Sequence, residues 1–179
     1  MLEGFRRRVG LSYSQLHFRN NRDRIMNFTD ALTRSRRALV IFPESSLDGE
    51  SVLTLFRYLL RKFSSEGIMV LIREDQLFSM ASTPPLKTLT YSANDINTWF
   101  VPRRKLVQRI MTNTFDVALD LNIGLSLPSA FLCKASNAPL RVSFAKHGGD
   151  QFYNFQFQSK AAVGNTHTYR SFFKCLDMF

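Results

Sequence analysis

Residues 37–72 read RALVIFPESSLDGESVLTLFRYLLRKFSSEGIMVLI and contain two short apolar runs joined by an amphipathic segment. The runs, 38–42 and 68–72, contain no polar residue, which is typical of parallel strands that are covered on both faces. Between them, apolar residues recur with helical spacing from Val52 to Phe63. The stretch therefore predicts a strand, a helix and a second strand parallel to the first.

The same alternation of strand and helix continues towards the C-terminus. We expect further strands at 86–91, 115–121 and 140–144, and helices near 77–80, from Pro102 onward, over 128–136 and after Thr166. Residues 151–158, QFYNFQFQ, alternate aromatic and polar side chains, as a half-exposed strand at a sheet edge does. The prediction is a single α/β, Rossmann-like domain. Its doubly wound, mostly parallel sheet would have the strand order 3-2-1-4-5 and an added edge strand.

Composition narrows the class of protein further. The chain has 179 residues, of which 45% are hydrophobic, so it can bury a core and is not a wholly disordered chain. Its two cysteines lack the spacing of a zinc site, and we predict no metal and no cofactor. No apolar run is long enough to span a bilayer, and the N-terminus does not resemble a signal peptide. A cytoplasmic protein, soluble or peripheral on the membrane, is expected.

The first 37 residues carry more than half of the formal net charge of +10, because they hold nine arginines and three acidic residues. For 1–37 we predict a loose basic arm and an amphipathic helix with a stripe of Ile25, Met26, Phe28, Thr29 and Leu32, ahead of the α/β domain at 38–179. The helix can simply dock on that domain and leave its arginines solvated. Alternatively, Arg6, Arg7 and Arg8 contact anionic lipid or a protein partner; nucleic acid is disfavoured because no base-stacking motif is present.

Ligands of such sheets bind at the carboxyl ends of the strands, near the switch in strand order. The predicted ligand-cleft residues there are Ser45, Ser46, Asn122, Gly124, Ser126, His147 and Gly148. Asp48 and Glu50 are candidates for a general base, although acids at this position are also common at a helix start. Neither GxGxxG nor GxxxxGK[ST] occurs, so no dinucleotide or P-loop phosphate site is indicated. Asp120 lies in an otherwise apolar strand, where we expect it to accept a hydrogen bond from neighbouring backbone.

Residues 37–72 resemble the opening of the heptosyltransferase-like glycosyltransferases of the GT-B fold. In that family a first strand leads to a Ser-x-Gly-Asp turn, a helix that ends in Leu-Arg-Lys, and a second strand. The segment 115–144, FDVALDLNIGLSLPSAFLCKASNAPLRVSF, resembles the family's Phe-Asp-x-x-x-Asp-Leu strand and the helix that follows it. The match covers roughly residues 36–145. The chain's size and organisation also resemble a family of small uncharacterised bacterial proteins from the Bacteroidetes–Chlorobi group.

The resemblance implies the N-terminal, acceptor-side half of a GT-B enzyme. The family's catalytic base is the Asp of the Gly-Asp turn, whereas here the order is Asp48-Gly49, and the donor-binding second domain would follow Phe179. We therefore expect a non-catalytic binding or scaffold subunit on the cytoplasmic side, in an assembly or at a membrane surface. One alternative is a glycosyltransferase that uses Asp48 or Glu50 as base and takes its donor domain from another chain. A second is a phosphosugar or small-molecule binding module.

Aromatic residues crowd the last 28 positions. We expect Tyr153, Phe155, Phe157 and Phe172 to contribute to an exposed apolar patch that contacts a protein partner or a second copy of the chain. The alternative is that these aromatic side chains all pack internally.

Overall fold

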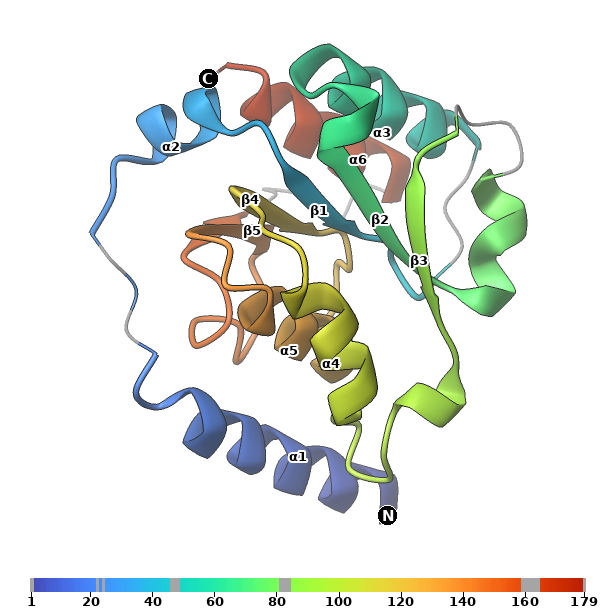
Figure 1. Cartoon of the computed structure of the whole chain (residues 1–179), viewed down its shortest axis with the longest axis vertical. Coiled ribbons are helices and arrows are strands. Elements are labelled where there is room, and N and C mark those ends of the chain that lie inside the picture. Colours follow the sequence, from blue (N-terminus) through green and yellow to red (C-terminus); the bar gives the residue numbers. More distant parts are fainter. Residues whose placement is uncertain are drawn as a thin grey trace.

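A six-stranded parallel sheet forms the centre of the computed structural model, which describes residues 2–21, 23, 25–45, 49–80, 85–158 and 165–178 (Figure 1). The strands are β1 (Ala38–Ile41), β2 (Ile68–Arg73), β3 (Lys87–Tyr91), β4 (Val117–Asp120), β5 (Leu140–Phe144) and β6 (Phe155–Phe157). Their order is β3-β2-β1-β4-β5-β6, and every neighbouring pair is parallel. The Rossmann-like fold predicted from the sequence, with its added edge strand, is confirmed.

Helices cover both faces of the sheet. They are α1 (Leu2–Phe18), α2 (Phe28–Arg34), α3 (Gly49–Lys62), α4 (Arg104–Met111), α5 (Leu127–Ala135) and α6 (Asn165–Leu176), with 3₁₀ turns at Ser65–Gly67, Glu74–Met80 and Ala93–Asp95. α3 and α6 pack together over one face, and α4 and α5 over the other (Figure 1). α1 lies outside α5 as an additional layer.

The apolar runs read as buried strands are buried. In β1, Ala38 and Val40 belong to the core beneath α3 and α6, whereas Leu39 and Ile41 belong to the core beneath α4 and α5. Successive strand side chains point to opposite faces, so a strand with a core on each side needs apolar residues at every position.

The N-terminal segment differs from the predicted loose arm, because residues 2–18 form the regular helix α1. This helix packs through Gly10 and Ser14, its buried residues, and through the partly buried Leu11 and Phe18. A Cβ atom at Gly10 would lie 1.9 Å from the carbonyl oxygen of Trp99 and 2.9 Å from Leu127 Cδ2. The Ser14 hydroxyl donates to the Gly10 carbonyl over 2.8 Å, which satisfies it inside the contact.

The predicted apolar stripe at 25–32 is also corrected. The Asn27 side chain accepts the Asp30 amide over 3.3 Å and caps α2, so the helix begins at Phe28 and leaves Ile25 outside it, fully exposed. Before that cap, Asp23 holds the connector on the domain through ion pairs with Lys134, at 2.9 Å, and Arg141. The basic N-terminal segment is thus held on the domain by helix α1 and by the ion pairs of Asp23.

The C-terminal aromatics lie mostly inside the protein. Tyr153 and Phe172, expected at an exposed patch, are buried, so that part of the expectation is wrong. Phe155 and Phe157 are half-buried; Phe155 stacks on Phe28, with ring centroids 3.8 Å apart. β6 is shorter than 151–158 because the backbone amides of 152 and 153 bond to the Gly149 carbonyl in a turn, instead of joining the sheet.

Candidate functional site

A cavity of about 1010 Å³ opens at the carboxyl ends of β3, β2, β1 and β4, four neighbouring strands. Its wall includes Glu44 after β1, Arg73 at the end of β2, Tyr91 at the end of β3, and residues 122–128 after β4. β1 and β4 are neighbours from which the chain winds in opposite directions, so the cavity lies at the switch in strand order. This is the place where open α/β sheets bind their ligands.

Helix α1 closes one side of this cavity with Arg7, Arg8 and Leu11. The Arg7 guanidinium lies over the Phe100 ring, 5.2 Å from its centroid, and pairs with Glu3 at 3.3 Å. Phe100 has a φ of 61°, a conformation that a bulky residue rarely adopts. The Asn97 side chain accepts the amides of Trp99 (2.9 Å) and Val101 (3.0 Å), and this turn presents the ring to Arg7.

The charges of the wall are mixed. Arg7, Arg8 and Arg73 line the cavity together with Glu44, Glu74 and Asp75. Arg73 makes a two-pronged contact with Asp75, in which Nε and Oδ1 are 3.0 Å apart, and this hydrogen bonding raises the pKa of Arg73. Burial, reinforced by the nearby Glu44 carboxylate, raises the pKa of Tyr91, so its hydroxyl remains a hydrogen-bond donor.

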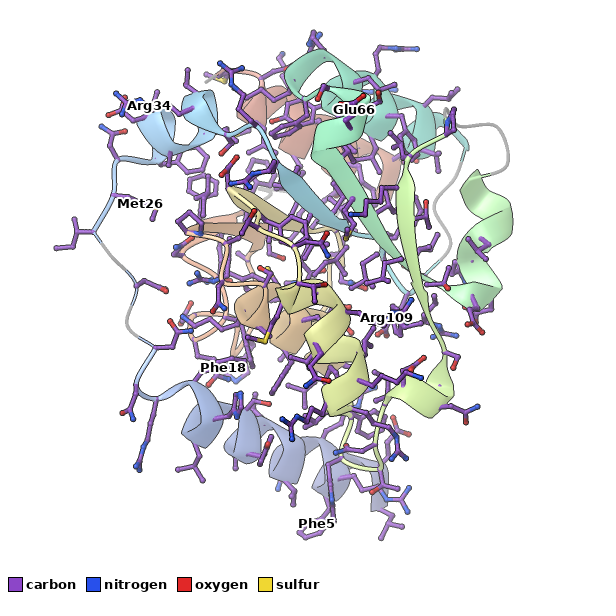
Figure 2. The ribbon with its side chains drawn as sticks, viewed as in Figure 1. Phe5, Phe18, Met26, Arg34, Glu66 and Arg109 are labelled. Carbon is purple, nitrogen blue, oxygen red and sulfur yellow. The ribbon has the colours of Figure 1, made fainter. Side chains whose placement is uncertain are left out.

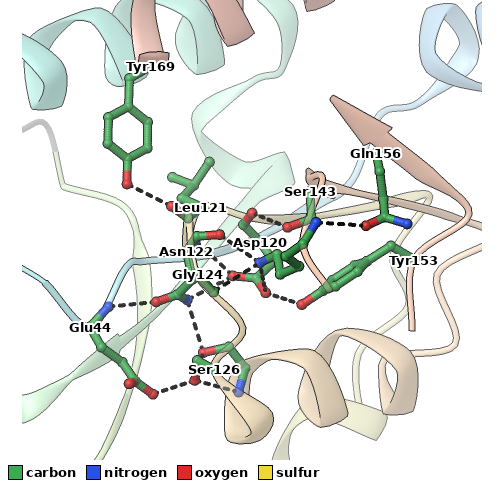
Figure 3. A network of polar contacts seen from close by, with 12 residues as sticks. Glu44, Asp120, Leu121, Asn122, Gly124, Ser126, Ser143, Tyr153, Gln156 and Tyr169 are labelled. Carbon is green, nitrogen blue, oxygen red and sulfur yellow. Dashed lines mark hydrogen bonds and ion pairs between the residues drawn. The ribbon is translucent and has the colours of Figure 1, made fainter. Parts of the chain in front are cut away.

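A polar network fixes the side chains after β1 and β4 (Figure 3). The Asn122 side chain accepts the Glu44 amide over 2.9 Å and donates to Asp120 Oδ1 (2.8 Å) and Ser129 Oγ (3.1 Å). The Ser126 hydroxyl donates to the Glu44 carboxylate. These contacts tie the two loops together, so their polar groups are positioned before any ligand arrives.

Asp120 is the buried centre of this network. It accepts the Asn122 backbone amide over 3.0 Å, as expected from the sequence, and also the Tyr153 hydroxyl. The Lys146 ammonium lies 3.4 Å from Asp120 Oδ2 and donates to the Asn122 carbonyl over 2.6 Å. Burial, and next the Asp120 charge, raise the pKa of Tyr153, so Tyr153 stays protonated and donates. Asp120 and Lys146 therefore support the cavity wall.

Four of the predicted cleft residues meet in the cavity: Ser45, Asn122, Gly124 and Ser126. His147 and Gly148, although described, are not part of its wall, so their placement there is wrong. The reason is Lys146, which folds beneath Asn122 and leaves His147 exposed. Ser46 and Asp48 lie outside the described residues. Glu50 lies in the first turn of α3, and its side chain is not described.

Sequence reasoning missed several wall residues. It assigned Arg7 and Arg8 to an interface, whereas they line the cavity. Arg73 and Tyr91 each end a predicted strand, and this position was a signal that could have identified them. Glu44 lies in the loop after the first strand, for which the sequence analysis named Asp48 and Glu50 as candidates but not Glu44.

No group of three His, Cys, Asp or Glu residues in the described ranges could hold a metal ion. Among the helices that the structure describes, none is long and apolar enough to cross a bilayer.

Comparison with known proteins finds a similarity of fold but no similarity of sequence. No protein-family model matches the sequence, and no curated protein matches it. The fold is similar to the crystal structure of the glycosyl transferase family 9 from Veillonella parvula DSM 2008, with a TM-score of 0.59 and 12% sequence identity. The similarity covers 88% of this chain and 44% of that one, so the chain spans less than half of that structure.

The chain is therefore a Rossmann-like α/β protein whose fold is similar to part of that structure. The resemblance to small Bacteroidetes–Chlorobi proteins finds no support in these comparisons.

Proposed function

We propose that this chain is a glycosyltransferase-like binding domain that holds a phosphorylated sugar in the strand-end cavity. The observation that carries the proposal is the composition of the wall. Arginines from α1 line the same cavity as the Glu44, Asn122 and Ser126 side chains at the ends of β1 and β4.

The two kinds of wall group suit the two parts of such a ligand. Guanidinium groups bind phosphate oxygens with charge-assisted hydrogen bonds. Carboxylate, amide and hydroxyl groups fixed by a surrounding network bind sugar hydroxyls, and the Phe100 ring offers an apolar face to a pyranose. The cavity volume of about 1010 Å³ is at the upper end of the range for small-molecule sites, which is roughly 300–1,000 Å³.

We further propose that the domain does not catalyse sugar transfer by itself and acts as a binding or scaffold subunit of a larger cytoplasmic assembly. The Asp48-Gly49 order supports this, because the resemblance aligns glycine with the family's catalytic base. The second candidate is a heptosyltransferase-type glycosyltransferase whose donor domain comes from another chain. The fold similarity to a glycosyl transferase family 9 protein favours it.

Calorimetric titration of the full chain with hexose 1-phosphates tests the proposal. We expect the Arg7→Gln/Arg8→Gln double variant to lose at least about tenfold in affinity, since each charge-assisted hydrogen bond contributes about 1.5–3 kcal/mol. The matched control is Arg57→Gln on α3, an exposed arginine outside the wall, which should bind normally. Turnover of a nucleotide-sugar by the purified chain that Asp48→Asn or Glu50→Gln abolishes would replace the binding proposal by the second candidate.

A further inference from the structure

Helix α1 carries an apolar stripe on the side that faces away from the domain. The stripe consists of Leu2, Phe5, Val9, Tyr13 and Leu16, whose spacings of three and four residues place them on one helical face. Leu2, Phe5 and Leu16 are exposed by 64%, 60% and 64%. Figure 2 shows Phe18 on the side of α1 towards the domain and Phe5 on the outer side.

An ordinary surface helix turns its apolar stripe towards the core. α1 docks through Gly10, Ser14 and the partly buried Leu11 and Phe18, but it leaves Leu2, Phe5 and Leu16 exposed. Trp99 extends the stripe, because its ring is 39% exposed and lies edge-to-face with Phe5 at 6.5 Å. A contiguous exposed apolar surface of this kind marks a place where the protein meets another phase or partner.

The charges beside the stripe indicate what covers it. Helical geometry places Arg6 on one flank and Arg8, which also reaches the cavity wall, on the other, and the exposed Arg19 follows in the turn after the helix. The single acid of the helix, Glu3, is paired with Arg7. A second copy of α1 would bring arginine against arginine, which is unfavourable, whereas an anionic surface is complementary to both flanks.

We propose that α1 seats the protein on an anionic lipid surface. Its apolar stripe and Trp99 would enter the boundary between headgroups and acyl chains, and the flanking arginines would contact lipid phosphates. The helix is 17 residues long and would lie in the plane of the surface. This attachment goes beyond the proposed function and does not require a ligand in the cavity.

Binding of the full chain to vesicles tests the proposal. The vesicles contain phosphatidylglycerol mixed with phosphatidylcholine, or phosphatidylcholine alone as the neutral reference. Trp99 is the sole tryptophan, so its fluorescence reports on the stripe directly. We expect co-sedimentation with the anionic vesicles, a blue shift of the Trp99 emission, and weakening of both by added salt.

Two pairs of variants separate the parts of the surface. Phe5→Ser/Leu16→Ser should lower the affinity for anionic vesicles at least about tenfold, because each side chain contributes roughly 1.5–3 kcal/mol on burial. The matched control is Leu53→Ser on α3, which removes a leucine that is 55% exposed and should bind like the wild type. Arg6→Gln and Arg19→Gln should each reduce the affinity about fivefold, whereas Arg57→Gln should not.

Three results would overturn the proposal. The first is absence of binding to anionic vesicles by the wild-type chain. The second is equal loss in the Leu53→Ser control and in the stripe variant. The third is a dimer in sedimentation velocity that Phe5→Ser/Leu16→Ser dissociates, because the stripe would then be an interface between two copies. All replaced side chains are at least partly exposed, and circular dichroism checks that each variant is folded.

Discussion

Replacing Gly10 by alanine should loosen α1 from the domain and open the cavity wall. The added Cβ would lie 1.9 Å from the Trp99 carbonyl oxygen and 2.9 Å from Leu127 Cδ2, and the first of these obstacles is backbone. Ordinary contact begins near 3.4 Å, so the helix must move away from the turn that carries Phe100.

The size of the effect follows from two opposing contributions. Overpacking of this kind costs about 1–3 kcal/mol, while alanine is favoured over glycine inside a helix by about 1 kcal/mol. Gly4 provides the matched control on the same helix, because a Cβ there meets nothing within 4 Å. Gly4→Ala should thus stabilise the protein, and Gly10→Ala should be about 1–3 kcal/mol less stable than Gly4→Ala. That difference corresponds to a melting temperature roughly 2–12 °C lower.

Urea denaturation and acrylamide quenching of Trp99 measure the outcome. If α1 undocks without global unfolding, the quenching of Trp99 should rise even where the denaturation midpoint moves little, because Trp99 lies against the helix. Equal stability and equal quenching in Gly10→Ala and Gly4→Ala would refute the docking of α1 described above.

Two further predictions concern charged pairs with a buried member. Asp23→Asn should destabilise the protein by about 1–3 kcal/mol, because Asp23 accepts a hydrogen bond from Lys134 and forms an ion pair with Arg141, and both of these partners are buried. Despite the opposing effect of partial burial, these partners lower the pKa of Asp23 below 3.8. Its stabilisation is therefore complete above about pH 4 and is lost as the pH falls through the folded-state pKa, so the wild type and Asp23→Asn should converge in acid unfolding curves. Asp120→Ala leaves the Lys146 ammonium buried without its partner and should cost about 3–5 kcal/mol in urea denaturation; a loss below 1 kcal/mol would contradict the supporting role of this pair.

The strands β1 and β2 could be predicted because each consists almost entirely of apolar residues, and a parallel sheet covered on both faces demands that composition. α1 could not be recognised as a docked helix, since its buried residues are Gly10 and Ser14 and it has apolar residues on both its inner and its outer side. An apolar pattern reveals the helix face but not which side meets the domain.

In the candidate site, too, some residues could be identified from their place after a strand, whereas others depend on contacts between segments that are distant in the sequence. Asn122 and Ser126 were identified because they follow a predicted strand, and strand ends converge at one edge. His147 also follows a strand, yet it lies outside the cavity because Lys146 reaches the Asn122 carbonyl, a contact between distant loops. Arg7 and Arg8 enter the wall through tertiary docking of α1, for which the sequence carries no local signal.

Titration of the full chain with a hexose 1-phosphate, with the parent hexose and inorganic phosphate as partial ligands, tests the central claim most directly. We predict that the phosphorylated sugar binds more tightly than either part, and that Arg7→Gln/Arg8→Gln weakens it while Arg57→Gln does not. No heat of binding for any hexose 1-phosphate at millimolar concentration, or equal affinity in the wild type and the Arg7→Gln/Arg8→Gln variant, would contradict a phosphosugar site in the cavity.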